Sequence, residues 1–123
     1  MTPLGAKIRE LRQKRGVSLK EMAAALSVSS AYLSALEHGK RGKPTWFLVQ
    51  RIITYFNVIW DEAEEIQRLA ELSDPKVSID TSGLDPKATE LANRMATTID
   101  GLSRDSLDHL LHQLRTVAAK DGV

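Results

Sequence analysis

The chain has 123 residues, of which 42% are hydrophobic and 27% are charged, and its formal net charge is +1. This length fits one domain, or one domain with a small addition, and the absence of cysteine excludes disulfides, cysteine-ligated zinc and thiol catalysis. The net charge conceals an asymmetry, because residues 1–51 hold 10 Lys and Arg against 3 Asp and Glu, and residues 52–123 hold 7 against 13. The first part therefore carries +7 and the second −6, and a basic part of a chain attracts polyanions.

The first predicted helix spans residues 3–15. Thr2 precedes Pro3, which is a typical arrangement of an N-cap and a proline at the first helical position. Gly16 ends the helix, and its apolar residues recur at helical spacing at Leu4, Ile8 and Leu11. The other face is basic, with Lys7, Arg9, Arg12, Lys14 and Arg15.

Two short helices follow, joined by a tight turn. Ser18 and Glu21 form a capping box at the start of the second helix, whose buried residues are expected to be Leu19, Met22, Ala23 and Leu26. Residues 27–29 form the turn, with Val28 as a buried plug. Ser29 caps the third helix, which runs to Glu37 before Gly39 and faces inward with Leu33, Leu36 and part of Tyr32.

A basic loop, residues 40–44, leads to two further helices. Thr45 caps the fourth helix, Asn57 ends it, and its expected core residues are Phe47, Leu48, Ile52, Ile53 and Phe56. Trp46 could pack inward, touch DNA or lie in a dimer contact, and inward packing is the default expectation for a lone aromatic residue. The fifth helix starts at Asp61 and faces inward with Ile66, Leu69 and Leu72. Residues 1–73 thus form a five-helix unit.

The remaining residues divide into a connection and two amphipathic helices. Residues 74–85 form a linker or a short strand, because residues 76–80 alternate in polarity and a lone strand would need a partner, such as its copy in a second chain. Helices are expected over residues 86–100 and 103–120. Each has an apolar stripe that must be covered, so residues 86–123 are interpreted as a dimerisation element, the alternative being that they fold back on the fifth helix of the same chain. The fold class is all-α.

The second and third helices have the composition of a helix-turn-helix. This motif needs a small residue where the helices cross, a compact plug in the turn and buried anchors on the second helix, and Ala23, Val28 and Leu33 meet these needs. The exposed face of the third helix is then small and polar, with Ser30, Ala31, Ser34 and Ala35 beside the edge of Tyr32. Such a face can enter a DNA major groove about 12 Å wide.

The sequence that contains these two helices resembles that of a known protein family. The stretch IRELRQKRGVSLKEMAAALSVSSAYLSALEHGKRGKP within residues 4–72 is similar to the DNA-binding domain of phage Cro and lambda-repressor-type regulators, the XRE family. The resemblance implies a compact five-helix bundle. Members of the family bind palindromic operators as dimers, usually to repress transcription. Two positions depart from the family pattern, since Leu19 stands where Gln is frequent and Ser27 stands where Gly is common in the turn.

The resemblance also assigns the DNA-binding residues. It places the base-reading face at Ser29, Ser30, Ala31, Ser34 and Ala35, and lets Tyr32 reach a base edge or a phosphate. Lys40, Arg41 and Lys43 would contact the phosphate backbone after the third helix. Because the reading face has no Gln, Asn or Arg, sequence choice would depend on Ser hydroxyls, alanine contacts with thymine methyl groups, Arg41 and DNA shape.

The sequence therefore predicts a cytoplasmic, dimeric, sequence-specific repressor of transcription that is not an enzyme. We expect no cofactor, no metal and no membrane span, and a solvated helix face explains His109 and His112 better than a metal site does. Two alternatives stay open. The chain could be an autorepressing antitoxin that binds a toxin through residues 74–123, or a protein-interaction module that has lost DNA binding.

Overall fold

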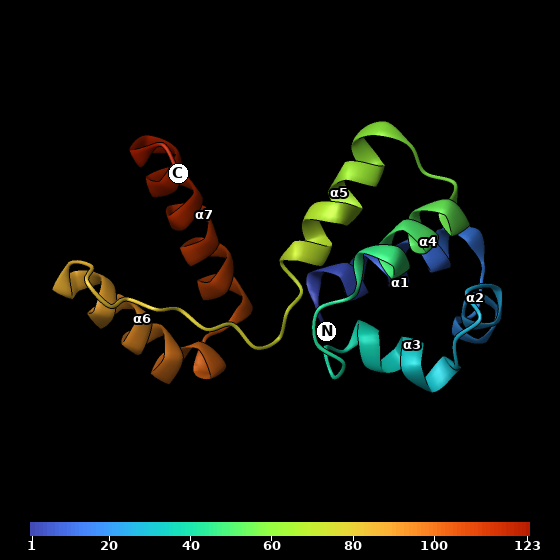
Figure 1. Cartoon of the computed structure of the whole chain (residues 1–123), viewed down its shortest axis with the longest axis horizontal. Helices are drawn as coiled ribbons and strands as arrows, with labels where there is room; N and C mark the ends of the chain where they lie inside the picture. The colour runs from blue at the N-terminus through green and yellow to red at the C-terminus, as the bar shows by residue number, and fades with distance from the viewer. The chain divides into compact units, whose positions relative to one another are not determined.

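The computed structural model describes residues 1–123 and contains seven α-helices, one 3₁₀ helix and no strand (Figure 1). This confirms the all-α class. The chain divides into two compact units, Met1–Val77 and Ser78–Val123, and the boundary between them falls inside the predicted linker 74–85.

The first unit contains the five expected helices, which are α1 (Pro3–Arg15), α2 (Leu19–Ala25), α3 (Ser30–Glu37), α4 (Trp46–Phe56) and α5 (Trp60–Glu71). The sequence sets most of their ends. The side chains of Thr2, Ser18, Ser29 and Thr45 each accept a hydrogen bond from a backbone N–H in the first turn of the helix that follows. Gly16 and Asn57 end α1 and α4 in the left-handed conformation.

The start of α5 differs from the prediction by one residue. The helix begins at Trp60 rather than at Asp61, and the preceding Ile59 offers no capping side chain. Trp60 itself has a φ of 53°, which is an unfavourable backbone conformation for a bulky residue. The acidic residues of the first turn, Asp61 and Glu62, lie where the helix dipole favours negative charge.

The core of the first unit lies between the five helices. Helix α1 packs against α3 and α5, α2 packs against α3, and α4 packs against α5. The large apolar side chains fully removed from water are Leu4, Ile8, Met22, Leu33, Ile52, Phe56 and Ile66. All seven were expected to face inward, so the helical periodicity identified the centre of the core.

Three expected core residues are instead exposed. Phe47 is 74% exposed and Leu72 is 70% exposed, whereas Val49 and Ala70 are buried on the same two helices. Trp46 is 66% exposed and stacks edge-to-face on Phe47, with 5.3 Å between ring centroids. Helix α4 is apolar at nearly every position of its first turn, so spacing alone does not select its inward face, and Leu72 lies at the C-cap, beyond the last helical residue.

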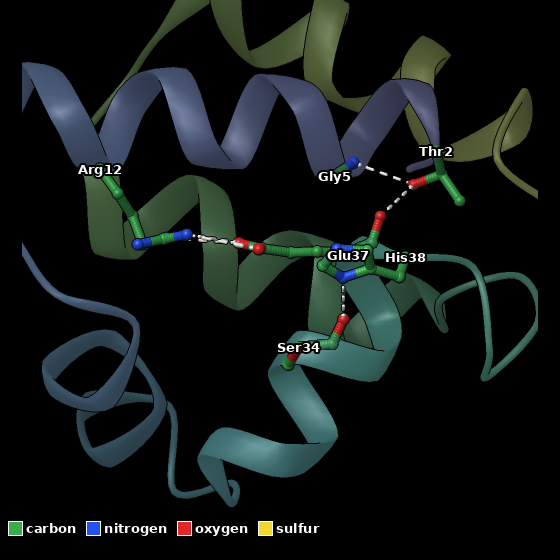
Figure 2. A network of polar contacts seen from close by, with 6 residues as sticks. All are labelled: Thr2, Gly5, Arg12, Ser34, Glu37 and His38. Carbon is green, nitrogen blue, oxygen red and sulfur yellow. Dashed lines mark hydrogen bonds and ion pairs between the residues drawn. The ribbon is translucent and has the colours of Figure 1, made fainter.

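The ends of α1 and α3 approach each other closely (Figure 2). The Thr2 backbone N–H donates to the Glu37 carbonyl over 3.0 Å, and the Thr2 hydroxyl accepts from the Gly5 N–H over 2.9 Å. A Cβ atom on Gly5 would lie 2.1 Å from the Glu37 carbonyl oxygen, so only glycine fits at this crossing. The buried Ser73 hydroxyl accepts from the Leu4 N–H over 2.9 Å, which fixes the start of α1 to the segment after α5.

The second unit contains α6 (Pro86–Thr98), the 3₁₀ helix η1 (Ile99–Gly101) and α7 (Arg104–Asp121). Both predicted helices are thus present, with Asp85 and Ser103 as their N-caps. Residues 76–80 form no strand, and a turn follows in which Ser82 donates to Asp80. Hydrogen bonds from the Ser82 hydroxyl and backbone lower the pKa of Asp80. No residue of this unit is buried.

Candidate nucleic-acid interface

Helices α2 and α3 are joined by the predicted tight turn, and Figure 1 shows them next to each other at one edge of the first unit. The Val28 N–H donates to the Ala23 carbonyl over 3.0 Å, and the Val28 side chain packs against the core. Ser27 has a φ of 57°, in the left-handed region where glycine has no steric cost. Ser27, which stands where the family commonly has glycine, therefore adopts the backbone conformation that favours glycine.

Helix α3 has one buried face and one accessible face. Leu33, Leu36 and Glu37 are buried. The predicted reading residues are on the accessible side, where Ser29, Ser30 and Ala31 are exposed and Ser34 and Ala35 are partly exposed. The structure thus brings the predicted reading residues together on one small, polar surface that carries no long side chain.

The basic loop after α3 is held at both ends. Gly39 and Gly42 adopt positive φ angles of 78° and 77°, and the Lys40 N–H donates to the Ala35 carbonyl over 2.8 Å. The Lys43 ammonium forms a 2.6 Å ion pair with Glu71 on α5. This pair is exposed, and such pairs contribute only about 0–1 kcal/mol, so Lys43 can exchange Glu71 for another anion.

Tyr32 and Arg41 are in contact with each other. The guanidinium carbon of Arg41 lies 5.2 Å from the centroid of the Tyr32 ring, which is within the range of a cation–π interaction. Tyr32 is partly buried against the core, and Arg41 is exposed and forms no ion pair. The sequence places both residues among the DNA contacts, but the pairing joins a helix to a loop and has no signal in the local pattern.

Several basic residues of the N-terminal part are used inside the fold. Arg12 forms a 3.1 Å ion pair with Glu37, and Lys7 lies 3.7 Å from both Glu62 and Glu65. Arg15 donates to the Phe56 carbonyl and Arg51 to the Leu26 carbonyl. Part of the net charge of +7 in residues 1–51 is therefore engaged within the fold and is not available to bind a polyanion. Lys40 and Arg41, which have no acidic partner, lie next to the accessible face of α3.

No group of three or more His, Asp or Glu side chains is arranged to hold a metal ion. None of the helices has the length and apolar character needed to cross a membrane.

Comparison with known proteins identifies the motif. Residues 3–69, just over half of the chain, match the protein family described as "Helix-turn-helix domain". The chain belongs to this helix-turn-helix family. The match covers α1 to α4 and most of α5, and it includes the accessible face of α3 and the basic loop. The resemblance to XRE-type regulators found in the sequence is thereby confirmed.

Curated relatives are similar over this helix-turn-helix domain. The "Uncharacterized HTH-type transcriptional regulator RghRB" of Bacillus subtilis (strain 168) is 33% identical over 61 residues, which are 50% of this chain and 44% of that protein. The "HTH-type transcriptional regulator DdrOP3" of Deinococcus deserti is 38% identical over 61 residues, 50% of this chain and 47% of that protein. The chain thus matches under half the length of either relative. A solved structure, the "SinR protein/SinI protein complex", aligns with a TM-score of 0.44 and 22% identity over 94% of this chain and 98% of that one.

Proposed function

We propose that the protein is a sequence-specific double-stranded DNA-binding regulator of transcription that inserts α3 into the major groove. The observation that carries this proposal is the accessible face of α3, which is small and polar. This face belongs to a domain of the helix-turn-helix family. A helix with short side chains on its outer face can lie deep in the groove, where hydroxyl groups and methyl groups reach base edges. The curated relatives, which are named as transcriptional regulators, support the same role.

The loop after α3 supplies the electrostatic part of the interface. Lys40 is exposed without an acidic partner, and Lys43 has only the exchangeable Glu71. Beside a helix in the major groove, ammonium groups at these positions would bind backbone phosphates and release counterions. Such contacts fix the orientation of α3 on the duplex and contribute affinity for any sequence.

The second unit supplies the dimer. Helices α6 and α7 leave large apolar side chains at least two-fifths exposed, and no residue between Ser78 and Val123 is buried. Two short helices cannot form a core under these conditions, so their stripes need a partner. A second copy of the chain is a suitable partner, because it is always present wherever the protein is made. The second unit holds 5 Lys and Arg against 7 Asp and Glu, so two copies of it would repel each other little. The exposed apolar side chains are Leu91, Met95, Ile99, Leu110, Leu111, Leu114 and Val117.

A dimer of this kind would bind a palindromic operator, since two-fold symmetry in the protein is matched by two half-sites in the DNA. We propose that it acts in the cytoplasm as a repressor, by occupying its operator, and that it has no enzymatic activity. A partner protein on the second unit is the alternative to the second copy, and the experiments below distinguish the two.

The proposal is tested by immunoprecipitation of the tagged protein from its native cells and sequencing of the bound DNA. We expect a few sharp peaks that share a palindrome. The variant Ser30→Glu places a negative charge on the reading face in the first turn of α3, where the helix dipole tolerates it, and should abolish the peaks without unfolding the domain. The matched control Ser78→Glu, at an exposed residue of the second unit, should keep them. A flat profile for the expressed wild type would overturn the proposal.

A further inference from the structure

We propose that Arg41, held in place by the Tyr32 ring, reads a guanine of the operator and so provides the base-specific contact that α3 itself lacks. This inference rests on the proposed DNA-binding function and names part of its specificity. The family resemblance places Arg41 among the phosphate contacts, and the composition of the reading face gives it a part in sequence choice; the inference names the base it contacts and the residue that supports it.

The need for such a residue follows from the composition of the reading face. Ser30, Ala31, Ser34 and Ala35 have short side chains, and none of them forms the pair of parallel hydrogen bonds that distinguishes one base from the other three. Single hydroxyl groups accept and donate, so they discriminate weakly between base edges. Strong discrimination by direct contact with a base therefore needs a side chain from outside the helix, and Arg41 contacts a side chain in the first turn of α3.

The Tyr32 ring is a fixed support. The Tyr32 N–H donates to the Ser29 hydroxyl over 3.0 Å, so the residue lies in the capped first turn of α3. Its side chain packs against the core, which restricts the ring. The guanidinium carbon of Arg41 lies 5.2 Å from the ring centroid. An arginine that stacks on an aromatic face keeps its N–H donors in the guanidinium plane, where they remain available to a ligand.

The loop also restricts where Arg41 can go. On one side the Lys40 N–H donates to the Ala35 carbonyl over 2.8 Å, and on the other Pro44 is buried. Arg41 therefore extends from a short anchored segment toward the N-terminal turn of α3. In helix-turn-helix complexes this end of the recognition helix approaches the base edges.

The chemistry of the guanidinium identifies the base. Guanine presents two acceptors, O6 and N7, side by side in the major groove, and they match two N–H donors of one arginine. A phosphate contact needs only a positive charge, which Lys40 and Lys43 on either side of Arg41 already provide. A planar group held by an aromatic ring is better suited to the directional contact.

The inference is tested by selection from a pool of random double-stranded DNA with the full chain and its variants. Arg41→Lys keeps the charge but cannot form the paired hydrogen bonds, so the selected motif should lose one guanine per half-site. Measured on single-base substitutions, the preference for that guanine should fall by about 5- to 150-fold, the range expected for one bidentate pair. Binding to random DNA should change little.

The Tyr32 variants test the support. Tyr32→Phe keeps the ring and should keep the guanine, whereas Tyr32→Leu keeps an apolar side chain but removes the ring and should weaken the preference for the guanine. Circular dichroism tests whether the Tyr32→Leu variant is folded. If it is not folded, the Arg41→Lys and Tyr32→Phe variants alone test whether Arg41 reads the guanine.

Each remaining outcome has a defined meaning. An unchanged motif for Arg41→Lys would overturn the inference and leave the proposed DNA binding intact. Loss of a preference for A·T pairs instead of a guanine would place Arg41 in a narrow minor groove and would also overturn it. If the wild type selects no motif at all, the proposed function itself fails.

Discussion

The guanidinium of Arg12 on α1 and the carboxylate of Glu37 at the end of α3 form a 3.1 Å ion pair, and the Glu37 side chain is only 1% exposed. Three donor–acceptor contacts of 3.1–3.3 Å join the two groups, from both Nε and Nη2 of the arginine. Because α3 is the proposed recognition helix, the pair fixes its C-terminal end to the rest of the domain (Figure 2). The side chain that the sequence assigned to the basic outer face of α1 thus has a role within the fold.

Removal of Arg12 should destabilise the domain strongly. Arg12→Met leaves the Glu37 carboxylate buried without its partner, and the loss of one member of a buried pair typically costs about 3–5 kcal/mol. The double variant Arg12→Met/Glu37→Leu removes both charges and should recover most of the loss. Urea unfolding followed by far-UV circular dichroism measures both. A loss below about 1 kcal/mol for the single variant would show that water or another group solvates Glu37.

Gly5→Ala should also destabilise the first unit. The added methyl carbon would lie 2.1 Å from the Glu37 carbonyl oxygen, so α1 and α3 must separate and the Thr2–Glu37 hydrogen bond must lengthen. We expect a loss of about 1–3 kcal/mol, as for other overpacked sites. Gly101→Ala is the matched control, because a Cβ atom on Gly101 meets nothing within 4 Å. Equal unfolding midpoints for the two variants would contradict the close approach.

Lys40→Ala should weaken binding to specific and random DNA alike. Each phosphate that the protein neutralises contributes about 0.9 to the slope of log K against log salt concentration, so the magnitude of the slope should fall by about that amount. Fluorescence anisotropy of labelled duplexes at several salt concentrations measures the slope. Lys87→Ala, at an exposed residue of the second unit, is the control and should leave it unchanged. A loss confined to the specific duplex would assign Lys40 to base reading instead.

Leu114→Glu should convert the proposed dimer to a monomer. Leu114 lies within the apolar stripe of α7, at 58% exposure, and a carboxylate there would be buried against the second copy. His112→Glu introduces the same group on the opposite face of the helix and should remain dimeric. Sedimentation velocity at matched concentrations distinguishes the two. If wild type and Leu114→Glu are both monomeric, the proposed dimerisation through α7 is wrong.

The sequence predicted local structure well because the signals for helix ends are themselves local. Thr2, Ser18, Ser29 and Thr45 act as N-caps at the expected positions, and the Ser18–Glu21 capping box is present. Each cap joins groups three residues apart, so the chemistry of a few neighbouring residues decides it. The five helices of the first unit could therefore be recognised before their packing was known.

Burial was harder to predict where helices are apolar all round. Phe47 and Val49 are both apolar residues near the start of α4, yet Val49 is buried and Phe47 is exposed, because the packing of α4 against α5 and the rest of the core selects one face of the helix. The site shows the same limit. The accessible face of α3 follows from the helical period, but the contacts Arg12–Glu37 and Tyr32–Arg41 join separate elements and depend on tertiary packing.

If two copies assemble through α6 and α7 as proposed, the absence of any buried residue between Ser78 and Val123 would link the folding of these two helices to the amount of protein in the cell. If assembly of two copies provides the only interior of the second unit, dilution would unfold α6 and α7 as well as separate the copies. Newly made chains at low abundance would then expose α6 and α7 to proteases, and chains above the association threshold would be protected. Degradation would remove dispersed protein faster than assembled protein, so the response of the regulated promoter to the abundance of this chain would be steeper than binding alone provides.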